Sequence, residues 1–169
     1  MSLIPYADLN DEALRPLVER ITAERGSVLE LYQMLLHSPA IAEGWLNYLT
    51  AVRQRSSLPG DLRELVIVRI ALVNGAPYEA QQHTPLAIQE GVSQQQIDDL
   101  AQWQSSPHFD DNQRAVLAYA DAMTRDVHVP AEISAQVRAR FAPQQLVELT
   151  ATIAAYNMVS RFLEALQIR

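Results

Sequence analysis

Two acids and one histidine flank the most apolar stretch of the chain, and together they could transfer protons. Glu64 lies near the start of the run LRELVIVRIALV, which the residues NGAP at 74–77 end, and Glu79 and His83 follow four residues apart. Residues four apart share one face of a helix. A carboxylate that orients one imidazole nitrogen raises its basicity and leaves the other nitrogen to exchange a proton with a substrate.

The same residues also have structural interpretations, which the sequence leaves open. The helix dipole favours a carboxylate in the first turn after Pro77, which by itself would explain Glu79. Glu79 and His83 could also form a surface pair. Glu64 and Arg69 both interrupt an apolar run and are expected to neutralise each other when buried. Arg69 could instead hold a substrate carboxylate. Glu64, Glu79 and His83 are also suitable metal ligands, although the HExxH spacing is absent.

Composition excludes several classes of function. The net charge is −7 and the pI is about 5.0, so no basic surface is available for a nucleic acid. The chain has no cysteine, which excludes disulfides, thiol nucleophiles and cysteine zinc sites. Neither a glycine-rich phosphate loop nor a GxSxG nucleophile elbow is present. No cofactor is expected from these patterns.

The pattern of charged residues speaks against export and against insertion in a membrane. The opening MSLIPYADLNDEAL lacks the basic start and apolar core of a secretion signal. The longest apolar run is interrupted by Arg69 and Asn74, so it is too short to span a membrane. We therefore expect a cytoplasmic protein with a small-molecule substrate and no membrane partner.

Helical spacing of apolar residues continues along the whole chain and predicts an all-α fold. The expected helices are residues 11–24, 27–37, 39–55, 62–73, 77–90, 93–104, 110–125, 130–140 and 143–166. They are expected to form a single domain, 1–169, with residues 1–26 as a helical extension. The segment 62–73 is apolar on nearly all sides and should be central. A weak repeat, LREL at 62–65 and LVEL at 146–149, predicts two similar helical halves.

The segment LRELVIVRIALVNGAPYEAQQHTPLAIQEGVSQQQI resembles the carboxymuconolactone decarboxylase and alkyl-hydroperoxidase-D family. The closing segment VELTATIAAYNMVSRFLEALQI is similar to the last helix of that family. The resemblance covers roughly residues 27–169. It implies an all-α helical bundle of the alkyl-hydroperoxidase-D type that assembles as a homo-oligomer, a trimer or hexamer.

The peroxidase branch of this family has a signature of Glu, eleven residues, Cys, two residues, Cys, three residues and His. In the same register this sequence has Glu64, Ala76, Glu79 and His83. The glutamate and histidine agree, but both cysteines are replaced. Thiol-dependent peroxide reduction needs a thiolate and a resolving thiol, so the chain cannot perform it.

The decarboxylase branch works without the redox cysteines and uses acid and base groups on a carboxylated enol-lactone. The resemblance to this branch implies a lyase-like enzyme in which His83 donates a proton while Glu64 or Glu79 sets its tautomer. The alternative is a non-catalytic oligomer of the same family that has lost the redox pair. A long apolar helix in so short a chain also favours an oligomer.

Overall fold

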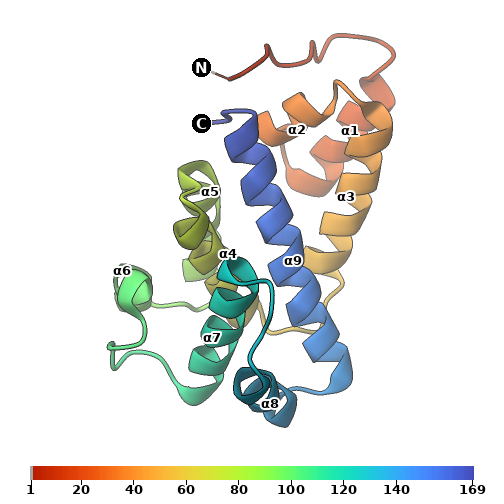
Figure 1. The fold of residues 1–169 in the computed structure, drawn as a ribbon. Helices are drawn as coiled ribbons and strands as arrows, with labels where there is room; N and C mark the ends of the chain where they lie inside the picture. The colour runs from red at the N-terminus through yellow and green to blue at the C-terminus, as the bar shows by residue number, and fades with distance from the viewer. Residues whose placement is uncertain (1) are drawn as a thin grey trace. The chain divides into compact units, whose positions relative to one another are not determined.

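The computed structural model describes residues 2–169, and within them the chain is helical and has no strand. Contacts divide the chain into two compact units. The first contains the residues up to Arg55 together with Leu163–Arg169, and the second is Ser56–Phe162. The predicted all-α fold is confirmed, and Figure 1 shows the order of the helices.

The first unit contains three helices, α1 (Arg15–Arg25), α2 (Glu30–Leu35) and α3 (Pro39–Gln54), and both α1 and α2 pack against α3. Thr50 on α3 donates a hydrogen bond of 2.6 Å to the Glu24 carboxylate and accepts one of 2.8 Å from Arg25. The Thr50 hydroxyl lowers the pKa of Glu24 below its ordinary value of 4.5, against the opposing effect of burial, and Arg20 lowers it further.

The second unit contains the other helices. They are α4 (Gly60–Asn74), α5 (Pro77–Gln89), α6 (Gln94–Asp99), the short 3₁₀ helix η1 (Leu100–Gln102), α7 (Asp111–Arg125), α8 (Ala131–Arg140) and α9 (Pro143–Ala165), whose last residues belong to the first unit. The single helix expected at 93–104 is therefore α6 followed by η1. Helix α4 packs against both α5 and α7, and α7 packs against α8.

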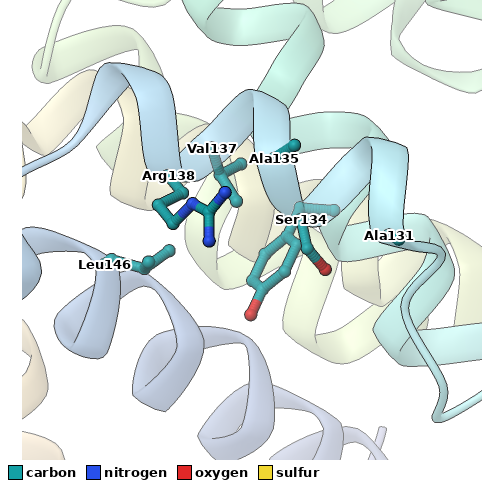
Figure 2. A pocket seen from close by; sticks show the side chains of 7 residues that line it. Ala131, Ser134, Ala135, Val137, Arg138 and Leu146 are labelled. Carbon is teal, nitrogen blue, oxygen red and sulfur yellow. The ribbon is translucent and has the colours of Figure 1, made fainter.

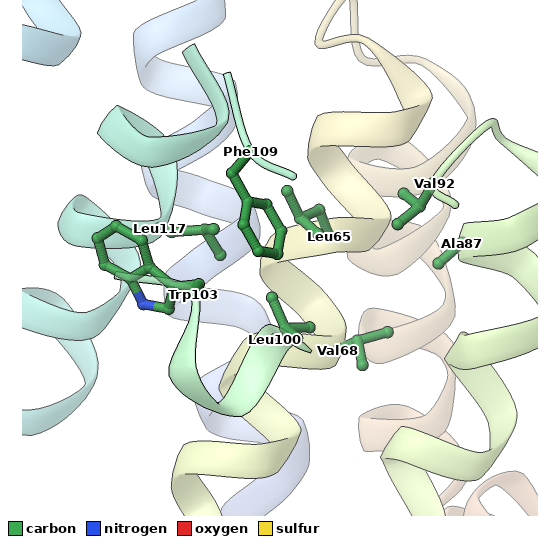
Figure 3. Close-up of a cluster of buried hydrophobic side chains, with 8 residues drawn as sticks. All are labelled: Leu65, Val68, Ala87, Val92, Leu100, Trp103, Phe109 and Leu117. Atoms are coloured by element: carbon green, nitrogen blue, oxygen red, sulfur yellow. The ribbon is translucent and has the colours of Figure 1, made fainter. Parts of the chain in front are cut away.

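Helix α4 is the central element of the second unit. Every residue from Leu62 to Ala71 is buried, as expected for a helix without a polar face. A cluster of apolar side chains joins α4 to α5, η1, α7 and the segments beside them (Figure 3): Leu65, Val68, Ala87, Val92, Leu100, Trp103, Phe109 and Leu117. This packing fixes the face of α4 that carries Glu64.

The two segments of the weak repeat lie near the starts of α4 and α9, and both belong to the second unit. The observed division of the chain therefore does not separate them. Among residues 2–169, no helix has both the length and the apolar character needed to cross a bilayer.

Candidate active site

The turn between α4 and α5 sets the position of the acid and histidine side chains. Gly75 ends α4 in the left-handed conformation, with φ of 64° and ψ of 38°, which residues with a Cβ rarely adopt. The amide of Ala76 then donates a hydrogen bond of 2.9 Å to the carbonyl of Ala71, as in a Schellman motif. Pro77 starts α5 at once, with the fixed φ that a first helical turn needs. The chain reverses, and α5 packs along α4.

Glu64 on α4 and His83 on α5 meet as a result of this reversal. The Nδ1 atom of His83 lies 2.7 Å from the Oε2 atom of Glu64. The two residues are only 2% and 8% exposed. Because an ionised carboxylate only accepts hydrogen bonds, Nδ1 carries the proton and donates it, which leaves Nε2 as the nitrogen that can take or give a proton.

Arg63 neutralises Glu64 from the other side. Its Nε atom lies 3.3 Å from Oε1 of Glu64, and its Nη2 atom lies 3.1 Å from Oε1 of Glu90, which is largely exposed. A chain of ion pairs and hydrogen bonds therefore runs from Glu90 through Arg63 and Glu64 to His83. The guanidinium favours the ionised form of the buried Glu64 carboxylate, and that form is the one that orients the imidazole.

The expected pairing of Glu64 with Arg69 is wrong. Arg69 donates to both carboxylate oxygens of Asp121, at 2.7 and 2.8 Å, and its Nη1 atom bonds to the carbonyls of Leu100 and Ala101. Five residues along a helix turn a side chain by about 140°, so Arg69 points away from Glu64. These bonds occupy all three nitrogen atoms of the guanidinium, which favours a structural role for Arg69 over binding of a substrate.

Glu79 is also buried, at 2% exposure, so the alternative of a surface pair between Glu79 and His83 is wrong. The hydroxyl of Ser160, on α9, donates a hydrogen bond to Oε2 of Glu79. Position 79 is where the peroxidase signature has a cysteine, and Ala76, at the other cysteine position, is buried at the start of α5. The redox pair is thus replaced by an apolar residue and a hydrogen-bonded acid.

One face of α9 covers the site, and sequence reasoning did not find it. The ring of Tyr156 stands edge-on to the imidazole of His83, with 4.9 Å between centroids and 86° between planes. Asn157 accepts a hydrogen bond of 3.1 Å from Asn74 at the end of α4. Residues 156, 157 and 160 lie on adjacent positions of a helix surface. The signal in the sequence is weak: Asn157 and Ser160 follow Tyr156 by one and four residues and interrupt an apolar helix.

No group of three His, Asp or Glu side chains among residues 2–169 is arranged to hold a metal ion. His83 contacts Glu64, and Glu79 lies four residues before His83 on α5. Each acid has its own protein partner, Arg63 and His83 for Glu64 and Ser160 for Glu79. The site as built is a set of proton-transfer and hydrogen-bonding groups.

Comparisons with known proteins agree with this architecture. Residues 39–122 match the model of the carboxymuconolactone decarboxylase family. The uncharacterized protein YnjA of Escherichia coli K12 is 32% identical over 126 residues, which are 74% of this chain and 66% of YnjA. The chain therefore spans slightly less than two thirds of that relative.

Solved structures resemble the chain over most of its length. A protein of unknown function from Agrobacterium tumefaciens, proposed to be the antioxidant defence protein AhpD, is 25% identical, with a TM-score of 0.75 over 80% of this chain and 93% of that one. A peroxidase-related protein with an AhpD core from Ralstonia eutropha JMP134 has a TM-score of 0.84 at 19% identity, over 99% of this chain and 91% of that one.

The debrominase Bmp8, as a cysteine-to-alanine variant in complex with 2,3,4-tribromopyrrole, has a TM-score of 0.83 at 17% identity, over 99% of this chain and 90% of Bmp8. At such identities the similarity to Bmp8 and to the Ralstonia protein establishes the fold alone. Together with the family match and the signature register of Glu64 and His83, these findings show that the chain belongs to the carboxymuconolactone decarboxylase family and has an AhpD-like fold.

Proposed function

We propose that this protein is a non-redox acid/base enzyme of the lyase type that acts on a small carboxylated or lactone-type metabolite. The observation that carries the proposal is the buried 2.7 Å contact between Glu64 and Nδ1 of His83. A carboxylate in this position holds one tautomer of the imidazole and stabilises its protonated form. The absence of cysteine rules out the thiol chemistry of the peroxidase branch.

In the proposed reaction, the bond between the ring carbon and the carboxylate of an enol-lactone breaks and carbon dioxide leaves. The electron pair delocalises into the conjugated carbonyl of the ring. The protonated imidazole of His83 then delivers its Nε2 proton to the lactone carbon that lost the carboxylate. A proton from solvent returns the imidazole to its protonated form. Glu64 keeps the imidazole in place through this cycle. Glu79, which accepts a hydrogen bond from Ser160 and lies one helical turn before His83, is the second acid of the proposed site.

A second function has support from a different observation. Each acid in the site has a hydrogen-bond partner within the protein and both are almost fully buried, as in a purely structural network. A non-catalytic oligomer of this family would use Glu64, Glu79 and His83 to hold α4, α5 and α9 together. Under that function, substitutions in the site would change stability or assembly and no reaction would be affected.

The proposed partners are a small-molecule substrate and further copies of this chain, in the cytoplasm. Large apolar side chains are exposed on α9, among them Val147 at 68% and Met158 at 37%. Exposed apolar surface favours association, so we propose a homo-oligomer, and the family resemblance implies a trimer or a hexamer. Light scattering at micromolar concentration tests this, and a monomeric mass would overturn it.

The experiment that tests the proposed activity is a screen of small carboxylated lactones and keto acids for release of carbon dioxide, performed in deuterium oxide. An acid/base lyase releases carbon dioxide and leaves one deuterium on the carbon that carried the carboxylate. The substitution His83→Gln should abolish both signals, whereas His128→Gln, at a position between α7 and α8, should change neither. Release that is equally fast in the His83→Gln protein would reject the proposed role of His83.

A further inference from the structure

A cavity of about 340 Å³ lies among α7, α8 and α9 and shares no residue with the proposed active site. Ser134, Val137 and Arg138 of α8 line it together with Leu146 of α9 (Figure 2), and Tyr119 of α7 completes the lining with two alanines. Its volume falls within the range of small-molecule sites. A hollow of about 430 Å³ along α9 shares Tyr119 and Leu146 with it, so the apolar lining continues beyond the cavity.

Arg138 is the only charged residue of the lining. Its guanidinium has no hydrogen bond or ion pair with any residue in the described part of the chain, 2–169, and Figure 2 shows it between Leu146 and Ser134. Arg138 is an exposed residue, so its guanidinium is open to a ligand from solvent, whereas the buried Arg69 uses every nitrogen on protein acceptors. A planar guanidinium beside an apolar wall is suited to a carboxylate, which it can bind with two parallel hydrogen bonds.

The hydroxyl of Tyr119 is oriented by its neighbour. Thr150 donates its only hydroxyl proton to the carbonyl of Leu146, at 2.7 Å. In the 3.1 Å contact between Tyr119 and Thr150, the tyrosine must therefore be the donor, which leaves lone pairs on the Tyr119 oxygen. A ligand group that donates a hydrogen bond, such as a hydroxyl, can satisfy this oxygen. Leu146 and Val137 are the large apolar residues of the same lining.

We propose that this cavity binds a small apolar monocarboxylate with a hydroxyl group at its far end. The carboxylate lies on Arg138, the apolar body on Val137 and Leu146, and the hydroxyl donates to Tyr119. The site is independent of the acid/base function proposed for His83, because the two share no side chain. It is a binding site, and it requires no covalent step.

Titration of the protein with three matched probes, followed by calorimetry and by amide chemical shifts, tests this proposal. The probes are para-hydroxyphenylpropanoate, phenylpropanoate and phenylpropanamide. We expect the hydroxy acid to bind most tightly, with the shifts confined to α8 and to the parts of α7 and α9 that line the cavity. Removal of the probe's hydroxyl should weaken binding, and replacement of its carboxylate by the amide should weaken it further.

Variants of the protein make the test specific. Arg138→Met keeps the apolar stem and should weaken binding of both acids by about tenfold or more, as expected for loss of a charge-assisted hydrogen bond. Arg140→Met, on the same helix but outside the lining, should leave affinity unchanged. Tyr119→Phe should abolish the preference for the hydroxy acid while the plain acid binds as before.

Three results would overturn the proposal. The first is the lack of saturable binding by any of the probes. The second is equal binding by the wild-type and Arg138→Met proteins, or of the amide and the acid. The third is an oligomer in which the amides around Ser134 and Arg138 fail to respond to any probe, since a second copy of the chain would then occupy the cavity. The variants are at exposed or half-exposed positions, and a circular dichroism spectrum confirms that they are folded.

Discussion

Glu64 and His83 form a buried carboxylate–imidazole pair, although they are nineteen residues apart in sequence and belong to different helices. The left-handed turn at Gly75 and the helix start at Pro77 bring them together. Oε1 of Glu64 contacts Arg63, which neutralises the charge of the carboxylate, and Oε2 orients the imidazole of His83.

The substitution Glu64→Gln should reduce turnover by about a hundredfold, because a neutral amide does not stabilise the protonated imidazole. It should also cost about 1–3 kcal/mol of stability, since Arg63 loses its buried partner and keeps only Glu90. Steady-state kinetics and urea unfolding measure the two effects. Glu43→Gln, at an exposed position, is the control. A Glu64→Gln protein with normal turnover would show that Glu64 has no part in the reaction.

The substitution Ser160→Ala removes the hydrogen bond to the buried carboxylate of Glu79. Hydrogen bonds to charged groups contribute about 1.5–3 kcal/mol, and we expect a loss of this size in urea unfolding. Combined with Glu79→Gln, the two changes should not be additive, since they remove the same contact. Ser105→Ala, on the surface, should have no effect. Additive losses in the double variant would mean that the two side chains do not interact in solution.

Loss of Arg69 should damage stability more than any change at the surface. Arg69→Met leaves the carboxylate of Asp121 buried without its main partner, which typically costs about 3–5 kcal/mol. Arg125→Met removes a more distant contact of the same carboxylate, at 3.8 Å, and should cost far less. Chemical unfolding compares the two variants. If Arg69→Met unfolds at the wild-type denaturant concentration but raises KM, the arginine binds substrate and the structural role is wrong.

Glu24 should give the protein a pH-dependent stability that Thr50 controls. The lowered pKa of Glu24 means that the unfolded chain binds a proton near pH 4.5 while the folded protein does not. The ionised Glu24 therefore contributes fully to folding stability above pH 4.5. This contribution is lost as the pH falls through the lower pKa of Glu24 in the folded protein. Thr50→Val removes the largest cause of the shift, so the variant should lose less stability over this interval.

Urea unfolding at neutral pH and at several acid values measures the effect of Thr50→Val. Thr22→Val removes a hydroxyl that bonds to the carbonyl of Val18 within α1, so it is the matched control and should keep the wild-type slope. An unchanged slope in the Thr50→Val protein would show that the hydroxyl does not set the pKa of Glu24.

The helices were predictable because proline and glycine mark where they begin and end. Helices α3, α5 and α9 begin at Pro39, Pro77 and Pro143, where the sequence predicted them. The periodic apolar pattern predicted the other helices. The helix expected at 62–73, for example, is observed at Gly60–Asn74. The break between α6 and η1 was missed, since a tightening of the last helical turn leaves no mark in an apolar pattern.

The residues of the proposed site were easier to predict than the hydrogen bonds and ion pairs that they form. Glu64 and His83 could be proposed from spacing, but the pairing of Arg63 with Glu64 could not, because adjacent residues of a helix point in different directions. The arginine side chain is long enough to bring its guanidinium within 3.3 Å of the Glu64 carboxylate. The bonds from Ser160 to Glu79 and from Arg69 to Asp121 depend on how helices cross, and no local pattern encodes them.

The most direct test of the central claim, that His83 transfers a proton to substrate, is kcat of the His83→Gln protein on a substrate found by the carbon dioxide screen. We predict a fall of at least about a hundredfold, with the helical spectrum retained and with His128→Gln at the wild-type rate. A His83→Gln protein that turns over as fast as the wild type would contradict the claim and leave the buried pair a structural contact.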